Sequence, residues 1–379
     1  MSKQQVSFFW FRRDLRLEDN VGLFHALKSK YTVIPLFIFD DAILDSLPYN
    51  DPRVGFIYEN LSKINTQLLK IESALLVKKG KTLAVWELLL TEFDIKEVFF
   101  NKDYEPYAIK RDSAICELLE TNNAIAFSFK DQVIFEEKEI TKADGLPYTV
   151  YTPFKNKWLE KYKSMAPVLE YDATDVFSNF HKCDFVFPSL EQIGFEKSPI
   201  KVKPHNLKFI ANYQDIRDFP ALDQTSYLSP HLRFGTVSIR KLVNWAFHKN
   251  DVFLSELIWR EFFMQILFSF PRVVTQNFKS AYDGIQWRNN EEDFKRWCTG
   301  TTGYPMVDAG MRQLNETGFI HNRVRMVVAS FLCKHLLIQW QWGEAYFAEK
   351  LLDYDLSANV GNWQWAAGTG CDAAPYFRV

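Results

Sequence analysis

One carboxyl group stands among aromatic residues in the segment ELIWREFF at positions 256–263. If this segment is helical, spacings of three, four and seven positions put four side chains on one face: Glu256, Trp259, Arg260 and Phe263. A carboxyl group in such apolar surroundings is costly unless it has a partner. Either Glu256 pairs with Arg260 within the helix, or its pKa is raised and the carboxyl is presented to a ligand.

A side-chain amide and a thioether lie four positions apart in the segment HNRVRM at 321–326. On a helix, Asn322 and Met326 would share one face. The amide could bond an amide-like edge of a ligand, and the sulfur offers a soft apolar surface. The alternative is an ordinary first helical turn with Arg323 and Arg325 in solvent.

Hydroxyl side chains cluster in TSYLSPH at 225–231, just before an expected helix start. Hydroxyls and free N–H groups at such a place suit a phosphate, although capping of the helix also explains them. Two carboxylates further along, Asp353 and Asp355, would repel a phosphate. They suit ribose hydroxyls, a flavin edge or Arg325 better, and a solvated acidic turn is the alternative.

The stretch 353–376 combines these carboxylates with Asn359, two tryptophans and several small residues. Small residues let a planar ligand approach the backbone closely, and Trp offers flat faces for packing or for stacking on a base. A tight Ala/Gly-rich loop over an aromatic core accounts for the same composition. Core packing is also the default for Trp287, Trp340 and Trp363, which no spacing links.

Composition narrows the class of protein. The chain has 379 residues, enough for two or three domains, and its 47% apolar and 24% charged content is ordinary for a globular protein. A net charge of −2 neither requires nor excludes nucleic acid. The five cysteines form no CxxC pair and predict no metal or disulfide framework. We expect no signal peptide and no bilayer-spanning run, and the sequence lacks GxGxxG, P-loop, HExxH and GxSxG motifs.

The elements that must position these side chains fall into three parts. Residues 1–130 alternate strands and helices, which predicts an α/β domain with a doubly wound parallel sheet. Prolines punctuate residues 131–206, which we interpret as a linker over the surface, ordered in parts. Residues 207–379 are predicted to be all-α. The expected strands are 6–11, 32–39, 74–78 and 97–100. The expected helices are 20–30, 57–69, 82–92, 253–270 and 322–340, and the last of these is predicted to be one continuous, buried helix.

Segments in order along the chain resemble motifs of the photolyase/cryptochrome family, closest to its class I cyclobutane pyrimidine dimer DNA photolyases. They are WFRRDLRLEDN at 10–20, TPFKNKW at 152–158, TSYLSPHLRFGTVS at 225–238, ELIWREF at 256–262, GYPMVDAGMRQL at 303–314, HNRVRM at 321–326 and NWQWAAGTG at 362–370. The resemblance implies an α/β antenna-type domain at 1–130 and a helical FAD-binding domain at 207–379.

The resemblance also implies which residues bind FAD. The phosphates would be held by Tyr213, Thr225, Ser226, Tyr227, Leu228 and Ser229. Asp353 and Asp355, with Arg325, would surround the flavin and the ribose. Asn359 would face flavin N5, and an asparagine there is typical of photolyases, which use fully reduced flavin (FADH⁻).

A pocket for a cyclobutane pyrimidine dimer is implied next to the flavin. Its residues would be Glu256, Trp259, Asn322, Met326 and Trp365, with Glu256, Asn322, Met326 and Asn359 as the catalytic group. His321 is single where photolyases for (6-4) lesions carry paired histidines, which favours the cyclobutane subtype. DNA phosphates would contact Arg217, Arg260 and Arg323, and electrons would reach the flavin through Trp287, Trp340 and Trp363.

These assignments imply light-driven repair of pyrimidine dimers in DNA by electron transfer from excited FADH⁻ to a flipped-out lesion, the activity of a deoxyribodipyrimidine photo-lyase. A cryptochrome-like blue-light photoreceptor without repair activity is the alternative. We expect a monomer in the cytoplasm, at the nucleoid when bound to DNA, with no metal and no membrane. Tyr107-Ala108 stand where some relatives carry an Asn-Glu pair for folate, so the resemblance disfavours folate and leaves a deazaflavin or no antenna open. Family members continue past the position of Val379, so we expect the helical domain to be incomplete at its C-terminus, which leaves FAD retention open.

Overall fold

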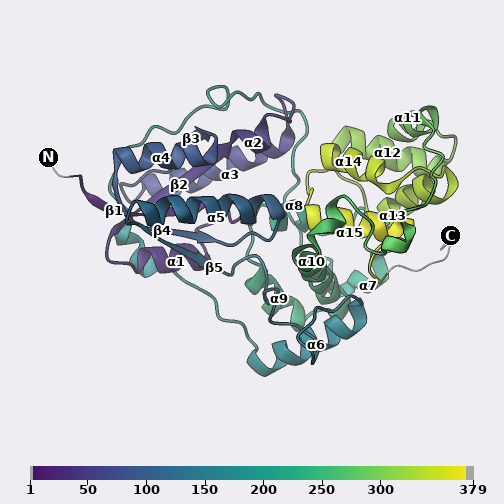
Figure 1. The fold of residues 1–379 in the computed structure, drawn as a ribbon, viewed down its shortest axis with the longest axis horizontal. Helices are drawn as coiled ribbons and strands as arrows, with labels where there is room; N and C mark the ends of the chain where they lie inside the picture. The colour runs from purple at the N-terminus through teal and green to yellow at the C-terminus, as the bar shows by residue number, and fades with distance from the viewer. Residues whose placement is uncertain (1–2, 373–379) are drawn as a thin grey trace. The chain divides into compact units, whose positions relative to one another are not determined.

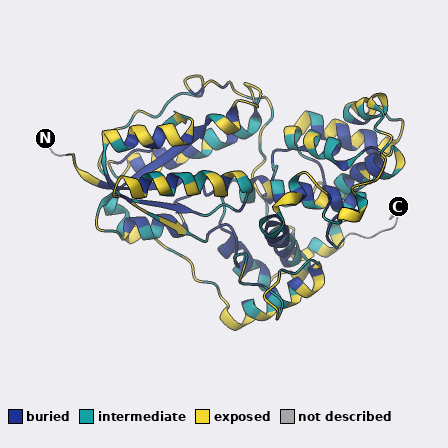
Figure 2. Cartoon of the chain, viewed as in Figure 1, coloured by how far each residue is buried: buried dark blue, intermediate teal, exposed yellow. Residues whose placement is uncertain are grey.

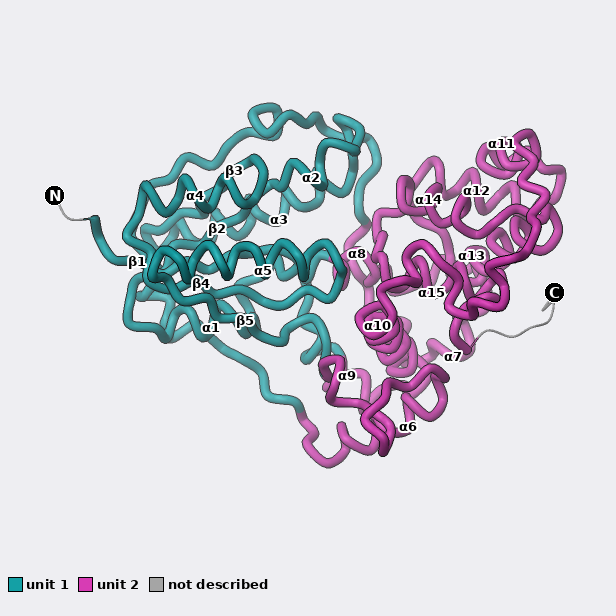
Figure 3. Tube along the Cα trace, in the orientation of Figure 1, with its two compact units in different colours: residues 1–134, 168–202, 234–242 teal, residues 135–167, 203–233, 243–379 magenta. Residues whose placement is uncertain are grey.

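The computed structural model describes residues 3–372, which form two compact units (Figure 3). Unit 1 comprises the described residues up to 134 together with 168–202 and 234–242. Unit 2 comprises 135–167, 203–233 and the described residues from 243 onward. The chain therefore passes between the units several times.

Unit 1 is built on a five-stranded parallel sheet (Figure 1). Its strands are β1 (Gln5–Phe11), β2 (Thr32–Asp40), β3 (Leu76–Gly80), β4 (Asp94–Asn101) and β5 (Ile125–Phe129), in the order β3-β2-β1-β4-β5. All four strand pairings are parallel. The predicted α/β class is confirmed, and β1 is the central strand.

Side chains of β1 alternate between two apolar layers, because successive residues of a strand point to opposite faces. Phe9 and Phe11 belong to the cluster that includes α1 (Val21–Leu27) and α3 (Pro52–Leu69). Phe8 and Trp10 belong to the cluster with α4 (Thr82–Glu92) and α5 (Pro106–Thr121). Figure 2 shows the central strands buried, as a doubly wound sheet requires. The short helix α2 (Asp41–Leu44) directly follows β2.

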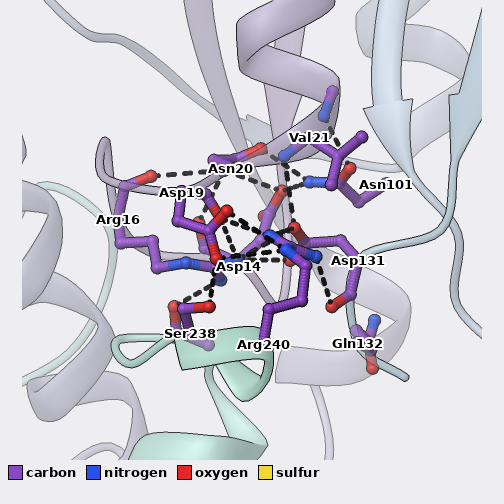
Figure 4. A network of polar contacts seen from close by, with 12 residues as sticks. Asp14, Arg16, Asp19, Asn20, Val21, Asn101, Asp131, Gln132, Ser238 and Arg240 are labelled. Carbon is purple, nitrogen blue, oxygen red and sulfur yellow. Dashed lines mark hydrogen bonds and ion pairs between the residues drawn. The ribbon is translucent and has the colours of Figure 1, made fainter. Parts of the chain in front are cut away.

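A buried network of charges lies in unit 1 after β1 (Figure 4). Arg16 Nη2 donates to both oxygens of Asp131 at 2.8 and 2.7 Å. Arg240 bonds Asp131 Oδ1 at 2.9 Å and Asp19 Oδ1 at 3.1 Å. Buried charges persist only when they are paired and hydrogen-bonded. The network thereby attaches the start of α9 (Ile239–Phe247) to unit 1.

The structure divides the predicted linker between the two units. Residues 168–202, which include η1 (Thr174–Asn179), place Phe180, Leu190 and Phe195 in the core of unit 1. Helix α6 (Tyr151–Met165) lies in unit 2, where Trp158 Nε1 donates to Glu261 Oε1 at 2.7 Å. Because of the prolines in this stretch, we did not predict helix α6 from the sequence. The structure divides residues 131–206 between two units, whereas the sequence predicted a separate linker.

Unit 2 is helical, as predicted. Its α-helices, besides α6 and the end of α9, are α7 (Tyr213–Ile216), α8 (Leu228–Arg233), α10 (Asp251–Ser269), α11 (Glu291–Thr299), α12 (Pro305–Thr317), α13 (Asn322–Ser330), α14 (Trp340–Lys350) and α15 (Leu356–Ala367). Short 3-10 turns are η2 (Ile210–Asn212), η3 (Pro220–Leu222), η4 (Pro271–Val274) and η5 (Ser280–Tyr282).

Helix α10 has clear start and stop signals. Asn250 caps it by accepting the Phe253 N–H at 2.9 Å, and Pro271 follows its end. At the start of α15, Asp355 accepts the Ala358 N–H at 3.1 Å, and Gly368 closes that helix with a φ of 84°.

The prediction of one continuous helix over 322–340 is wrong. Helix α13 ends at Ser330 and continues as a π-helical turn, η6 (Phe331–His335). Leu337 then adopts a φ of 55°, which no helix accommodates. Leu337 is 49% exposed, so the apolar run does not lie wholly in the core. Apolar composition alone could not reveal this break.

No helix within the described residues combines the length and the apolar character needed to cross a membrane.

Candidate functional site

A cavity of about 500 Å³ opens in unit 2 between its helices. This volume lies in the range of small-molecule and cofactor sites. The predicted residues that line it are Tyr213, Arg217, Ser226, Leu228, Ser229, Glu256, Trp259, Arg260, Asn322, Arg323, Arg325, Met326, Asp353, Asp355 and Trp365. Helices far apart in the sequence therefore bring the expected side chains together.

Two smaller hollows adjoin the cavity. Asn359 lines one of about 110 Å³, which shares Asn322, Met326 and Trp365 with the large cavity. Thr225 and Tyr227 line another of about 240 Å³, which shares Ser226, Ser229 and other residues with it. The expected flavin and substrate residues thus line three adjoining hollows within one unit.

Helix α10 presents the face that the spacing predicts, since Glu256, Trp259, Arg260 and Phe263 all line the cavity. Glu256 pairs with Arg217, whose Nη1 lies 2.7 Å from Glu256 Oε1. Burial raises the pKa of Glu256, and the charges of Arg217 and Arg323 oppose that shift. The carboxyl therefore keeps its proton to a higher pH than an exposed glutamate.

Trp259 is held by a residue that sequence reasoning missed. The Tyr151 ring stacks on it with centroids 3.5 Å apart and planes 8° apart. The Tyr151 hydroxyl donates to the Ser255 carbonyl at 2.7 Å, and burial raises its pKa. This stacking, with the Phe263 ring 5.5 Å from the indole centroid, fixes Trp259 where it lines the cavity. Tyr151 precedes the TPFKNKW motif, but nothing in its spacing identifies Trp259 as its partner.

Helix α13 contributes the amide and the thioether. His321 caps it, because its Nδ1 accepts the Arg323 N–H at 3.1 Å. Asn322 and Met326, one turn apart, both line the large cavity and the hollow of Asn359. The guanidinium of Arg323 lies 3.4 Å from the sulfur of Met326.

The hydroxyl-rich loop before α8 fits a phosphate-bearing group. The Thr225 hydroxyl is buried and has no hydrogen-bond partner in the described part of the chain. A buried polar group without a partner is unfavourable unless a ligand or water satisfies it. Tyr227 has a φ of 51°, and its hydroxyl accepts from Lys203 at 2.9 Å. The Thr225 hydroxyl is therefore free to bond a group that enters the adjoining hollow.

Acidic residues next to this loop are held in place by arginines. Arg325 donates to both oxygens of Asp353, at 3.2 and 2.8 Å. Arg233 lies 3.7 Å from Asp355. The pairing removes the repulsion that free carboxylates would exert on a nearby phosphate, which the sequence alone could not show.

Asn359 is oriented by Glu344, a second residue that sequence reasoning missed. The Asn359 Nδ2 donates to Glu344 Oε1 at 2.8 Å and to the Glu344 carbonyl at 3.1 Å. The amide oxygen is therefore left as an acceptor at the hollow that Asn359 lines. Burial raises the pKa of Glu344, and its bond from Asn359 opposes this shift. The separation of fifteen positions gives no helical signal for the pair.

The three predicted relay tryptophans belong to one apolar cluster. Trp363 and Trp340 are buried in it, and Trp287 packs against it from a partly buried position. Trp340 Nε1 donates to Asn277 Oδ1 at 2.8 Å. Trp297, which we did not predict, is buried there with its ring centroid 6.0 Å from that of Trp363.

The expected antenna position lies in unit 1. Tyr107 donates its hydroxyl to Asp40 Oδ2 at 2.6 Å, and burial, followed by that bond, raises its pKa to about 12. In residues 3–372, no group of three or more His, Cys, Asp or Glu side chains is arranged to hold a metal ion.

Two family models match the α/β unit and the helical unit and define the class of protein. The family described as DNA photolyase matches residues 7–174, and the FAD binding domain of DNA photolyase matches residues 253–379. The chain is 36% identical to the deoxyribodipyrimidine photo-lyase of Halobacterium salinarum, over 99% of this chain and 84% of that protein.

Solved structures agree. A bacterial class III photolyase from Agrobacterium tumefaciens matches with a TM-score of 0.86 and 34% identity, over 100% of this chain and 83% of that one. A cryptochrome from Synechocystis matches with a TM-score of 0.81 and 25% identity, over 100% and 85% of the two chains. The chain belongs to the DNA photolyase family; it is an enzyme of that family, and FAD is its cofactor.

Proposed function

We propose that this enzyme repairs cyclobutane pyrimidine dimers in DNA in a light-dependent reaction. The observation that carries the proposal is the placement of Glu256. This carboxyl has a raised pKa and lines one cavity with Trp259, Trp365, Asn322 and Met326. Hydrogen-bonding groups and flat apolar faces are what a fused pair of pyrimidines would require.

The residues of the cavity fit FAD at one side. The loop with the orphaned Thr225 hydroxyl would take the phosphates, and Asp353, held by Arg325, would take ribose hydroxyls. Asn359 would offer its amide oxygen to the flavin as an acceptor, because its Nδ2 already donates to Glu344. When bound in its reduced form, the flavin supplies the light-excited electron that opens the dimer.

Recognition of the lesion would rest on the other side of the cavity. A dimer stacks poorly, so flipping it out of the duplex is less costly than flipping a normal base pair. Trp259, fixed by Tyr151, and Trp365 would cover its faces. Asn322 would bond the pyrimidine edge.

Glu256 would hold a proton close to a pyrimidine carbonyl. A protonated carboxyl donates a hydrogen bond, and that bond strengthens as negative charge grows on the carbonyl oxygen. Burial raises the pKa of Glu256 and so favours the protonated form, whereas Arg217 opposes this shift. The side chain therefore stabilises charge without acting as a nucleophile.

The DNA backbone would be held by phosphate contacts from Arg217, Arg260 and Arg323, which line the cavity. Such contacts are independent of sequence and weaken with salt. One chain supplies every residue of the proposed pocket, which fits a monomer, and a DNA substrate would bring the protein to the nucleoid. We further propose Trp363, Trp340 and Trp287 as the relay that recharges the flavin.

The test uses FAD-loaded protein, chemically reduced, and an oligonucleotide with one cyclobutane dimer. Under blue light we expect the dimer to disappear, measured by chromatography, with no loss in the dark. An otherwise identical oligonucleotide with a (6-4) lesion is the matched control and should persist. Flavin-loaded protein that leaves the dimer intact in light would favour the photoreceptor alternative, which the resemblance to a cryptochrome keeps in view.

A further inference from the structure

Arg217 and Arg323, two arginines that line the cavity, are each paired with a carboxylate. Arg217 Nη1 lies 2.7 Å from Glu256, and Arg217 Nε lies 3.7 Å from Asp218. Arg323 Nε donates to Asp218 Oδ1 at 2.5 Å. Asp218 is the second residue after α7 and the chain neighbour of Arg217, so one exposed carboxylate contacts both arginines.

The two carboxylates in this chain of contacts differ in exposure. The Glu256 side chain is 30% exposed and lies in the cavity, whereas that of Asp218 is 55% exposed. An ion pair in water contributes little to stability, because solvent competes for both charges. The contact of Asp218 with Arg323 can therefore be exchanged for another anion at small cost.

A DNA phosphodiester is the anion that this exchange would serve. It carries one negative charge and forms charge-assisted hydrogen bonds with guanidinium groups, as a carboxylate does. Arg323 also touches the sulfur of Met326, so a phosphate on Arg323 would lie next to the cavity that Met326 lines. Asp218 itself does not line that cavity.

We propose that Asp218 competes with a DNA phosphate for Arg217 and Arg323 and thereby sets the affinity of the enzyme for the DNA backbone. This inference rests on the proposed function. In the free protein Asp218 neutralises the arginines. In the complex a DNA phosphate replaces Asp218 at the arginines. The Asp218 carboxylate stays nearby and weakens the attraction between the arginines and the DNA backbone.

The test is the substitution Asp218→Asn, which keeps size and polarity and removes the charge. Asp215→Asn is the matched control, because Asp215 is an exposed acid three residues earlier in α7. The FAD-loaded proteins are titrated in the dark with an undamaged duplex and with the same duplex carrying one dimer. Fluorescence anisotropy is recorded over a series of salt concentrations.

We expect Asp218→Asn to bind both duplexes about two- to fivefold more tightly at low salt, the range of an exposed ion pair. The slope of log affinity against log salt should steepen by up to about 0.9, the value for one additional neutralised phosphate. Asp215→Asn should change the affinity less and leave the slope as in the wild type. Equal behaviour of the two variants would overturn the proposal.

The variant Arg323→Gln separates a local exchange from a general effect of charge. In this background Asp218→Asn should lose most of its gain, because the shared arginine is gone. A gain of the same size in both backgrounds would contradict the proposal. If the wild type bound neither duplex, the proposed function would fail first; if it bound both and only the Asp218 effects were missing, the proposed function would stand and this inference alone would fall.

Discussion

Two groups of charged residues in this molecule have similar chemistry and different surroundings. In unit 1, Asp19 and Asp131 meet Arg16 and Arg240 with side chains that are at most 8% exposed. In unit 2, Glu256, Arg217, Asp218 and Arg323 form contacts with side chains that are 19–55% exposed.

The difference in burial decides what each group can do. A fully buried and hydrogen-bonded network resists change, because removal of one partner leaves an uncompensated charge. Asp14, which is buried next to this network, has a raised pKa, because burial disfavours its charged form and the charge of Asp131 adds to that effect. The partly exposed contacts beside the cavity can be exchanged for a ligand at small cost. We infer a structural role for the first group and a role in binding and catalysis for the second.

The largest expected effect is on stability. Arg240→Ala should lower the free energy of unfolding by about 3–5 kcal/mol, because Asp19 and Asp131 would remain buried without this partner. Denaturant unfolding followed by circular dichroism measures it. Arg217→Ala should change stability by less than about 1 kcal/mol. Lys241→Ala, next to Arg240 on the same helix but paired with Glu18 at the surface, is the control. Equal losses for all three would end the distinction between the two groups.

A second change leaves both charged groups intact and removes a proposed electron donor. Trp287→Phe should abolish most of the photoreduction of FAD in the presence of a thiol, because the ring is the outermost of the proposed relay. Repair by chemically reduced enzyme should be unaffected. Absorption spectra under blue light follow the flavin. Trp342→Phe, another partly buried ring at the same cluster, is the control. Normal photoreduction in Trp287→Phe would remove it from the relay.

A third change addresses the pocket itself. Glu256→Ala should reduce repair by about three- to tenfold, the worth of one hydrogen bond in the transition state. The flavin spectrum should remain, because Glu256 does not line the hollow of the phosphate loop. The assay is light-dependent loss of a single dimer. Asp251→Ala, an exposed acid of the same helix, should repair normally. An unchanged repair yield in Glu256→Ala would contradict its assignment.

The smallest effect concerns the pH dependence of stability. The pKa of Glu256 is raised by burial, so the folded state binds its proton more tightly than the unfolded state does. Stability contributed in this way is present below the unfolded pKa of about 4.3 and is lost as the pH rises through the folded pKa. Glu256→Gln should therefore unfold at a slightly higher temperature than the wild type near neutral pH, with no gain at acidic pH. A gain that grew toward acidic pH would have the wrong sign.

Local patterns made the fold of unit 1 predictable. The alternation of Phe8 and Trp10 with Phe9 and Phe11 identifies a strand buried on both faces, and the structure confirms it. The face of α10 followed in the same way from helical spacing. These features depend on neighbours in the sequence, which is why a single chain sufficed.

Long-range partners were not predictable. Glu256 pairs with Arg217, which lies outside its own helix. Asn359 is held by Glu344. Trp259 stacks on Tyr151, and Tyr151 lies in the proline-containing stretch that we interpreted as a linker. The break at Leu337 has no Gly or Pro to announce it. Each of these depends on packing between elements, which spacing along the chain does not encode.

The most direct test is the quantum yield of dimer loss in one defined oligonucleotide under blue light, measured for flavin-loaded, reduced wild type beside Glu256→Ala. The proposal predicts efficient loss with the wild type, a several-fold lower yield with the variant, and equal flavin content in both. A wild type that binds both FAD and the damaged oligonucleotide yet leaves the dimer intact in light would contradict it.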